Sequence, residues 1–263
     1  HEALGHFALE SAMDELAYAA GIDPVQLRLL NDSETDPLSG RPFSTRAIRK
    51  CLAEGGAHFG WDKRTSAPRS MRDGRYLIGQ GMAGAIYTHW RWPADARVTL
   101  RSDGSALVEA GMHELGTGTY TVMQQVAADA LGLAPERVTV HLGDTRLPTS
   151  HASIGSATMA NAGASVMLAA KAARDKAIEL ALAGREAPFA GSVPGQVVVD
   201  GGRLSVAHEN SSITYAELLA RNGMSELVAD GNYDPVEEAS GPKAVFSFAA
   251  VFAEVRVDPD LGL

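Results

Sequence analysis

The stretch Val98-Thr99-Leu100-Arg101-Ser102-Asp103-Gly104-Ser105-Ala106-Leu107-Val108-Glu109-Ala110 decides the order of the elements around it. Apolar and polar residues alternate before Asp103-Gly104, a dipeptide that favours a tight turn, and an apolar run follows it, so the stretch predicts a β-hairpin. The pattern then predicts a loop at 111–118, a helix at 119–131, a strand at 138–142, a loop at 145–157 and a long alanine-rich helix at 158–183. Two loops therefore each lead from a strand into a helix.

Three helices are predicted upstream of the hairpin. The first covers residues 7–20, with Leu9, Met13, Leu16 and Ala20 on one face, and the second runs to residue 31 from the N-cap Asp23 and Pro24. Ser44 is predicted to cap the third helix, which ends at Gly60. A basic connection at 62–75 then leads to a glycine-rich, apolar segment at 76–87, which predicts a buried strand.

Downstream, the sequence predicts another hairpin, at 196–199 and 203–206, a short helix capped by Thr214, and a long strand at 244–257. Strands and helices alternate irregularly and hairpins recur, which favours an α+β fold with mixed sheets and packed helices over a doubly wound parallel sheet. We expect two parts: a helical segment over 1–75 and an α+β domain over 76–263 that is incomplete at its C-terminal end.

Composition narrows the class of partner. The net charge of −9 argues against nucleic acid, since phosphate binding needs a basic surface. No apolar run approaches the roughly 18–20 residues of a membrane span, and the start lacks signal-peptide features, so no membrane partner and a cytoplasmic location are expected. The single cysteine, Cys51, excludes a disulfide or a cysteine-ligated iron–sulfur cluster within this chain. The start at His1 and the turn at 258–262 indicate an excerpt of a longer chain.

The two strand-to-helix loops could carry chemistry. The first reads Gly111-Met112-His113-Glu114-Leu115-Gly116-Thr117-Gly118-Thr119, and the second reads Thr149-Ser150-His151-Ala152-Ser153-Ile154-Gly155-Ser156-Ala157-Thr158. Glycines let a backbone approach a ligand, and helix starts offer free N–H groups, so the pair suits one extended anionic ligand. The alternative is two ordinary turns in which glycine supplies a positive φ and serine or threonine caps the helix.

A resemblance bears on this choice. The string 113–121, followed by Gln125-Val126-Ala127-Ala128-Asp129-Ala130-Leu131-Gly132, is similar to the glycine loop and helix of the molybdenum-cofactor-binding large subunit of the xanthine dehydrogenase / aldehyde oxidase (molybdenum hydroxylase) family. Gly155-Ser156-Ala157-Thr158 with Asn161 and Gly163 resembles that family's second cofactor loop, and residues 7–31 and 248–259 resemble its flanking elements. The resemblance runs nearly end to end and is closest to bacterial aldehyde-oxidase-like members.

The resemblance implies a fragment of an oxidoreductase that oxidises aldehydes or hydroxylates N-heterocycles with oxygen from water. It places the cofactor, molybdopterin or its cytosine dinucleotide form, on Gly116, Thr117, Gly118, Thr119, Gly155, Ser156, Ala157 and Thr158. The pterin carries the metal, so no protein metal ligand is expected. Many relatives have glutamine where this chain has the shorter Thr117, which puts contact to the metal centre in doubt.

The resemblance also implies partners: an iron–sulfur subunit, an FAD subunit and a small-molecule substrate, with export through a partner's signal as an alternative location. No catalytic residue is expected in this chain, because the family's glutamate base follows a later motif; the fragment alone is expected to be inactive and without cofactor. Glu114, His113, His151 and Asp144 are interpreted as loop residues, and the tryptophans as packing residues. Apolar surface along 244–257 predicts self-association. A binding or structural module without cofactor is the rival interpretation.

Overall fold

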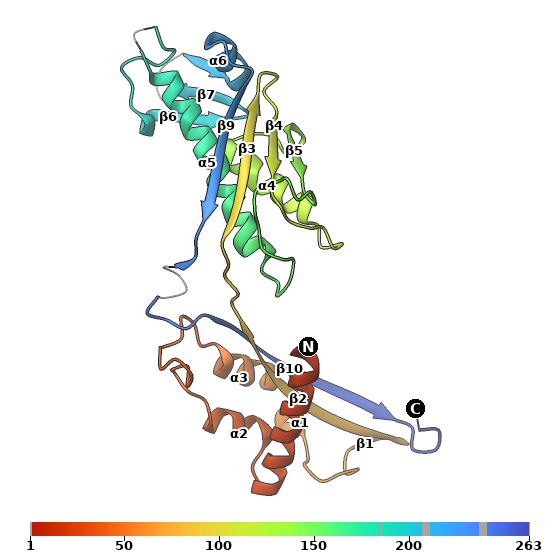
Figure 1. Cartoon of the computed structure of the whole chain (residues 1–263). Helices are drawn as coiled ribbons and strands as arrows, with labels where there is room; N and C mark the ends of the chain where they lie inside the picture. The colour runs from red at the N-terminus through yellow and green to blue at the C-terminus, as the bar shows by residue number, and fades with distance from the viewer. Residues whose placement is uncertain (1, 185, 207–210, 237–240, 263) are drawn as a thin grey trace. The chain divides into compact units, whose positions relative to one another are not determined.

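The computed structural model describes residues 2–184, 186–206, 211–236 and 241–262. The chain forms two compact units, one of residues 1–89 with 241–263 and one of residues 90–240 (Figure 1). Helices and sheets are mixed in both units, which confirms the predicted α+β class.

The second unit is built on a four-stranded sheet in the order β5-β4-β3-β9. Its strands are β3 (Ala94–Arg101), β4 (Ala106–Glu109), β5 (Val138–His141) and β9 (Glu226–Tyr233). β3 pairs antiparallel with β4, as the Asp103-Gly104 turn predicts, and also antiparallel with β9, whereas β4 and β5 are parallel. The parallel pair needs a crossover, and α4 (Thr119–Leu131) provides it.

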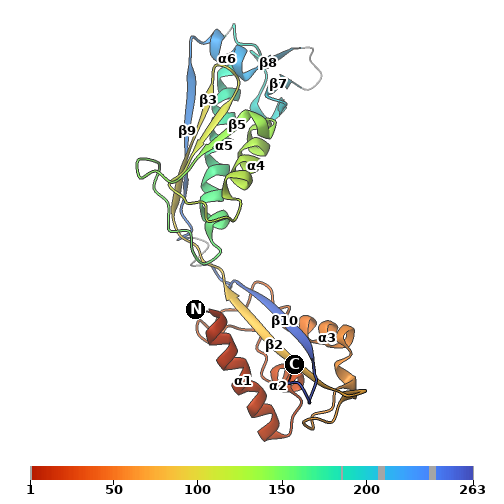
Figure 2. The same ribbon diagram turned by 90° about the vertical axis from the view of Figure 1, so that its right-hand side faces the viewer.

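Two helices, α4 and α5 (Thr158–Leu182), lie side by side on one face of this sheet (Figures 1 and 2). α5 turns mainly alanines toward the strands, so it can approach them closely. The contact is tightest at Gly231 of β9, where an added Cβ would lie 2.2 Å from the Ser165 carbonyl oxygen. The core between sheet and helices therefore depends on small residues at the point of contact.

A three-stranded sheet of β6 (Val197–Asp200), β7 (Arg203–Val206) and β8 (Ser212–Thr214) follows α5 after the short helix η3 (Pro194–Gln196). The Thr214 hydroxyl oxygen caps α6 (Tyr215–Arg221), and the Glu217 carboxylate accepts the backbone N–H of Thr214. These two bonds confirm the predicted cap. The Tyr215 hydroxyl donates to the Leu131 carbonyl oxygen at the end of α4. The short helix η2 (Pro135–Arg137) leads from α4 to β5.

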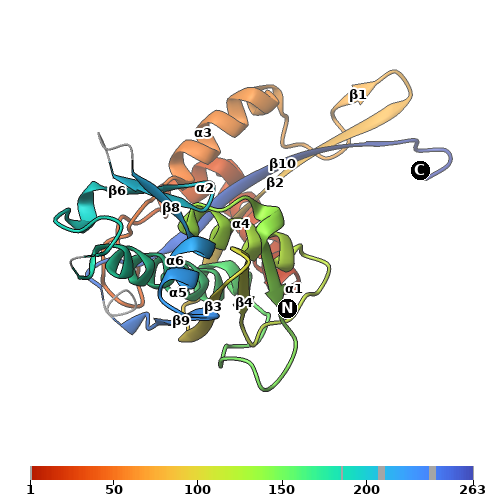
Figure 3. The same ribbon diagram turned by 90° about the horizontal axis from the view of Figure 1, so that it is seen from above.

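The first unit holds α1 (Glu2–Ala20), α2 (Pro24–Leu30), α3 (Ile48–Phe59) and η1 (Trp61–Lys63). Its sheet has the order β1-β2-β10, with β1 (Arg72–Asp73), β2 (Tyr76–Thr88) and β10 (Phe246–Val257). β2 and β10 pair antiparallel along twelve residues, and α3 lies alongside this ribbon (Figure 3). Phe252 of β10 packs on Phe59 and Trp61, which ties α3 to the ribbon.

Several sequence predictions are corrected. Ala47, not Ser44, precedes α3, because the Ser44 N–H bonds to the Ala244 carbonyl oxygen instead of opening the helix. β2 is only half-buried, since a ribbon with two long strands leaves one face open. Leu9 and Leu16 of the predicted apolar face of α1 are about half-exposed, and Ala17 is the buried contact.

β8 and β9 were missed by the sequence pattern. In β9 the inward residues are Leu227, Ala229, Gly231 and Tyr233 and the outward ones are mostly polar, so the alternation carries little hydrophobic signal. The boundary at residues 75/76 stays a prediction for the cofactor domain. The compact units divide elsewhere, because β2 pairs along its length with β10.

Candidate functional site

The two predicted loops leave the same edge of the sheet. β4 and β5 are parallel, with Glu109 opposite His141, so residues 110–118 and 142–157 both begin at the carboxyl ends of neighbouring strands. Ligands of α/β units bind at such carboxyl ends. The sequence order strand, loop and helix, repeated twice in parallel, therefore brings the two loops together.

Backbone hydrogen bonds join the loops directly. The Gly111 N–H donates to the Pro148 carbonyl oxygen at 2.9 Å, and the Gly143 N–H donates to the Met112 carbonyl oxygen at 2.8 Å. The Ser153 hydroxyl donates to the His113 carbonyl oxygen at 3.2 Å. A Cβ at position 111 would lie 2.6 Å from the Pro148 carbonyl oxygen, so only glycine allows this approach.

The first loop wraps its backbone around a carboxylate. Gly116 and Gly118 have left-handed backbones, with φ of 88° and 80°. Glu114 Oε1 accepts the N–H of Thr117 at 2.6 Å and that of Gly118 at 3.2 Å. Desolvation raises the pKa of Glu114, but backbone N–H donors, led by Thr117 and Gly118, outweigh it and leave the pKa below its ordinary value. Glu114 therefore holds the backbone of its own loop.

The second loop reaches its helix through two consecutive left-handed residues. Gly155 has φ 61° and Ser156 has φ 54°, an unusual conformation for a residue other than glycine. α5 then starts at Thr158 without a side-chain cap, and α4 also starts without one at Gly118. The glycines do supply positive φ, as the ordinary-turn interpretation expects, but serine and threonine do not cap these two helices. The left-handed Ser156 is strained, and strained backbone of this kind gathers at functional sites.

The structure places all eight predicted cofactor residues on these two loops and the first turns that follow them. The four of the first loop are Gly116, Thr117, Gly118 and Thr119, and the four of the second are Gly155, Ser156, Ala157 and Thr158. The hydrogen bonds that join the two loops are made by other residues, nearer the strands. Which of the eight contact a ligand stays a prediction.

A cavity of about 230 Å³ lies where the loops meet. It is lined by Gly111, His113, Gly143, Asp144, Thr145, Leu147, Pro148, Thr149 and Ser150, which sequence reasoning did not assign as ligand contacts. The Ser150 hydroxyl oxygen is buried and has no hydrogen-bond partner in the protein. A buried polar atom of this kind suits a polar ligand, and no sequence signal could have distinguished Ser150 from its neighbours.

Asp144, His113 and His151 each lie close to a polar group of these loops. Asp144 accepts the Arg146 N–H at 2.9 Å and pairs with its guanidinium, and these bonds lower the pKa of Asp144 to about 2. His113 Nδ1 lies 3.3 Å from Ser153 Oγ, and His151 Nδ1 lies 2.6 Å from the Ala152 carbonyl oxygen. In the described residues, no three His, Cys, Asp or Glu side chains gather as a metal site.

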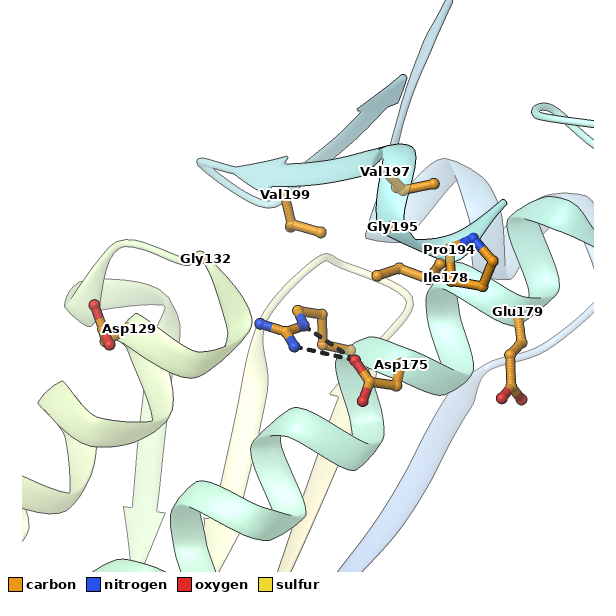
Figure 4. Close-up of a pocket in the computed structure, with 10 residues that line it drawn as sticks. Asp129, Gly132, Asp175, Ile178, Glu179, Pro194, Gly195, Val197 and Val199 are labelled. Carbon is orange, nitrogen blue, oxygen red and sulfur yellow. Dashed lines mark hydrogen bonds and ion pairs between the residues drawn. The ribbon is translucent and has the colours of Figure 1, made fainter. Parts of the chain in front are cut away.

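A larger cavity, of about 550 Å³, lies at the other end of α4 (Figure 4). Asp129 of α4 and Gly132, directly after that helix, line it, and Arg174 bonds to the neighbouring Asp175 within it. The cavity is at the helix end away from both loops, so it is not part of the candidate site.

The fold and the paired loops define an α+β domain in which two strand-to-helix loops adjoin at one edge of the sheet. The chain belongs to the family of molybdopterin cofactor-binding domains, whose model matches residues 54–263. It is 46% identical over 155 residues (59% of this chain, 21% of the relative) to the aldehyde oxidoreductase molybdenum-binding subunit PaoC of Escherichia coli (strain K12).

Two further proteins are similar. The xanthine dehydrogenase molybdenum-binding subunit of Escherichia coli O157:H7 is 36% identical over 142 residues, covering 51% of this chain and 19% of the relative. The CO dehydrogenase structure from Oligotropha carboxidovorans shares the fold with a TM-score of 0.75 at 21% identity, covering 98% of this chain and 35% of that one. The chain thus spans about a fifth of the length of these curated relatives.

Among the helices of the described part, none combines the length and apolar character needed to cross a membrane.

Proposed function

We propose that this chain supplies part of the cofactor cleft of a molybdenum hydroxylase large subunit that oxidises aldehydes or hydroxylates N-heterocycles. The observation that carries the proposal is the pairing of the two loops at the carboxyl edge of β4 and β5. Membership of the molybdopterin cofactor-binding family names the ligand. When bound, the molybdenum centre supplies the redox chemistry, with water as the oxygen source.

The protein atoms fit such a group. The pterin is rich in hydrogen-bonding atoms, and the loops offer the start of α5, which has no side-chain cap, and the buried Ser150 hydroxyl. In the first loop, the N–H groups of Thr117 and Gly118 already donate to the Glu114 carboxylate. Gly116, Thr117, Gly118 and Thr119 would hold it from the first loop. Gly155, Ser156, Ala157 and Thr158 would hold it, with its phosphate or cytosine nucleotide, from the second.

The roles of this chain's residues are to bind and orient. No residue of the chain is proposed as the catalytic base, and Glu114 in particular is bonded to its own loop. In the curated relatives this region lies in a molybdenum-binding subunit. We therefore propose an iron–sulfur subunit and an FAD subunit as partners, in the cytoplasm or, through a partner's export signal, in the periplasm.

The test is metal analysis of the full-length parent protein, purified with its neighbouring subunits. We expect molybdenum together with an excess of iron, and pterin released on denaturation. A well-folded complex that contains no molybdenum would reject the proposal and favour a structural or binding module.

A further inference from the structure

The segment Trp90-Arg91-Trp92 lies beside the second loop, although the sequence interpretation treats its tryptophans only as packing residues. β3 runs antiparallel to β4, so the residues directly before β3 are at the sheet edge from which both loops leave. The Asp95 N–H donates to the Thr149 carbonyl oxygen at 2.8 Å, which ties the start of β3 to the start of the loop.

The two indole rings form a stack that touches the loop at two points. Trp90 and Trp92 lie nearly parallel, with ring centroids 5.4 Å apart and an angle of 8° between them. The His151 ring lies 5.1 Å from that of Trp92. At the other contact, a Cβ added to Gly155 would lie 2.9 Å from Trp90 Cδ1, so the loop backbone rests against the indole.

Hydrogen bonds fix the backbone of this segment to the first turn of α5. Asn161 is fully buried; its Oδ1 accepts the Trp92 N–H at 3.1 Å, and its Nδ2 donates to the carbonyl oxygens of Trp90 at 3.4 Å and Ala157 at 3.0 Å. Arg91 Nη1 donates to the Ala160 carbonyl oxygen at 2.6 Å. The end of the loop and the helix start are thus bonded to residues 90–92.

We infer that Trp90, Arg91 and Trp92 are positioning residues that hold the second loop in its ligand-binding shape. Ser156 holds a left-handed conformation that is strained for a residue other than glycine, and α5 has no side-chain cap, so this part of the loop needs outside support to persist. The stack and the Asn161 bonds provide that support. The identity of the ligand in this inference rests on the proposed function; the positioning of the loop does not.

Hydrogen exchange of the full-length protein with its subunits, prepared without cofactor, tests the inference. In Trp90→Ala we expect amides of residues 149–160 to exchange about tenfold faster, the factor that corresponds to a lost aromatic contact, while residues 212–221 stay unchanged. Trp90→Phe keeps a ring and should restore most of the protection. Unchanged exchange at 149–160, or a uniform increase that Trp90→Phe does not reverse, would overturn the inference.

A matched pair of glycine variants gives an independent measure. Gly155→Ala combines a left-handed backbone with the approach to Trp90, whereas Gly223→Ala has a similar φ of 64° and open space around its Cβ. We expect Gly155→Ala to speed hydrogen exchange of the amides in its loop more than Gly223→Ala speeds exchange in its own turn. Equal increases in the two variants would contradict the contact between the loop and the Trp90 indole.

Molybdenum and pterin content of the same variants separates the two proposals. Faster exchange at 149–160 together with lower cofactor content supports both. Faster exchange with unchanged cofactor content leaves the positioning inference standing and removes the second loop from the proposed cofactor site.

Discussion

Ser156 holds a left-handed backbone conformation that glycine would adopt without strain. Its φ of 54° follows that of Gly155, and the residue is exposed on the second loop. Because strain in this conformation amounts to about 1 kcal/mol, Ser156→Gly should be more stable than Ser156→Ala by about that amount in urea unfolding. If the hydroxyl contacts the cofactor, both variants of the full-length protein should retain less molybdenum. Normal retention in both would remove Ser156 from the site.

Glu114 makes the first loop sensitive to acid. Its pKa is lowered in the folded protein from an ordinary value of 4.5, so its bonds to the loop are present above that value and are lost as the pH falls through the lower folded pKa. Amide NMR shifts of Thr117 and Gly118 should therefore move as the pH falls below about 4.5. Glu114→Gln should abolish this titration. A wild-type titration centred above 4.5 would contradict the assignment.

At the scale of elements, the contact of α5 with β9 sets how closely the helix layer approaches the sheet. A Cβ at Gly231 would lie 2.2 Å from the Ser165 carbonyl oxygen and 2.3 Å from the Ala169 nitrogen, both backbone atoms that cannot turn away. We expect Gly231→Ala to lower the free energy of unfolding by about 3 kcal/mol or more, because overpacking must move the helix.

The control for Gly231→Ala is Gly195→Ala, where an added Cβ meets nothing within 4 Å. Both variants add one methyl group to the same unit, and urea unfolding should separate them clearly. Similar midpoints for the two would show that α5 does not pack on β9 as described.

Sequence patterns predicted the elements whose signals are local. The Asp103-Gly104 turn, the Thr214 cap and the helices predicted at 119–131 and 158–183 depend on neighbouring residues, and the structure confirms them, with the second helix ending at Leu182. β9 was missed because its inward positions include Gly231, whose requirement comes from a helix some sixty residues earlier. The prediction that β2 is buried was wrong for a related reason, because burial depends on which elements cover a strand.

In the candidate site, too, features with local sequence signals were predicted and contacts between distant residues were not. Both loops were predicted from glycines and helix starts, which are local, and the resemblance supplied their ligand. The contacts of Gly111 with Pro148 and of Gly155 with Trp90 were beyond sequence reasoning, because residues distant in the chain meet only through the strand order. A Trp-Arg-Trp string directly before a strand is a weak local signal, which becomes informative only once β3 is known to start beside the loops.

At the scale of the whole molecule, β10 has a strand edge, unpaired in the described part of the chain, at which another copy of the chain could pair. The strand lies at the end of the order β1-β2-β10, so its outer edge has no neighbour among the described strands. Val251 and Val255, on the same face, are 59% and 58% exposed. An apolar edge strand of this length pairs readily with another chain, so we expect the 263-residue chain to self-associate, as its sequence predicts.

Lysine substitutions in β10 test self-association through this strand, because a charge on an edge strand opposes pairing. Light scattering of the 263-residue chain should show a mass above the 27.6 kDa of one chain, and Val251→Lys with Val255→Lys should return it toward one chain. Val228→Lys, at an exposed valine of β9 in the other unit, is the matched control and should leave the mass unchanged. If the wild-type chain is a monomer, or if the β9 variant alone dissociates it, association through β10 is excluded.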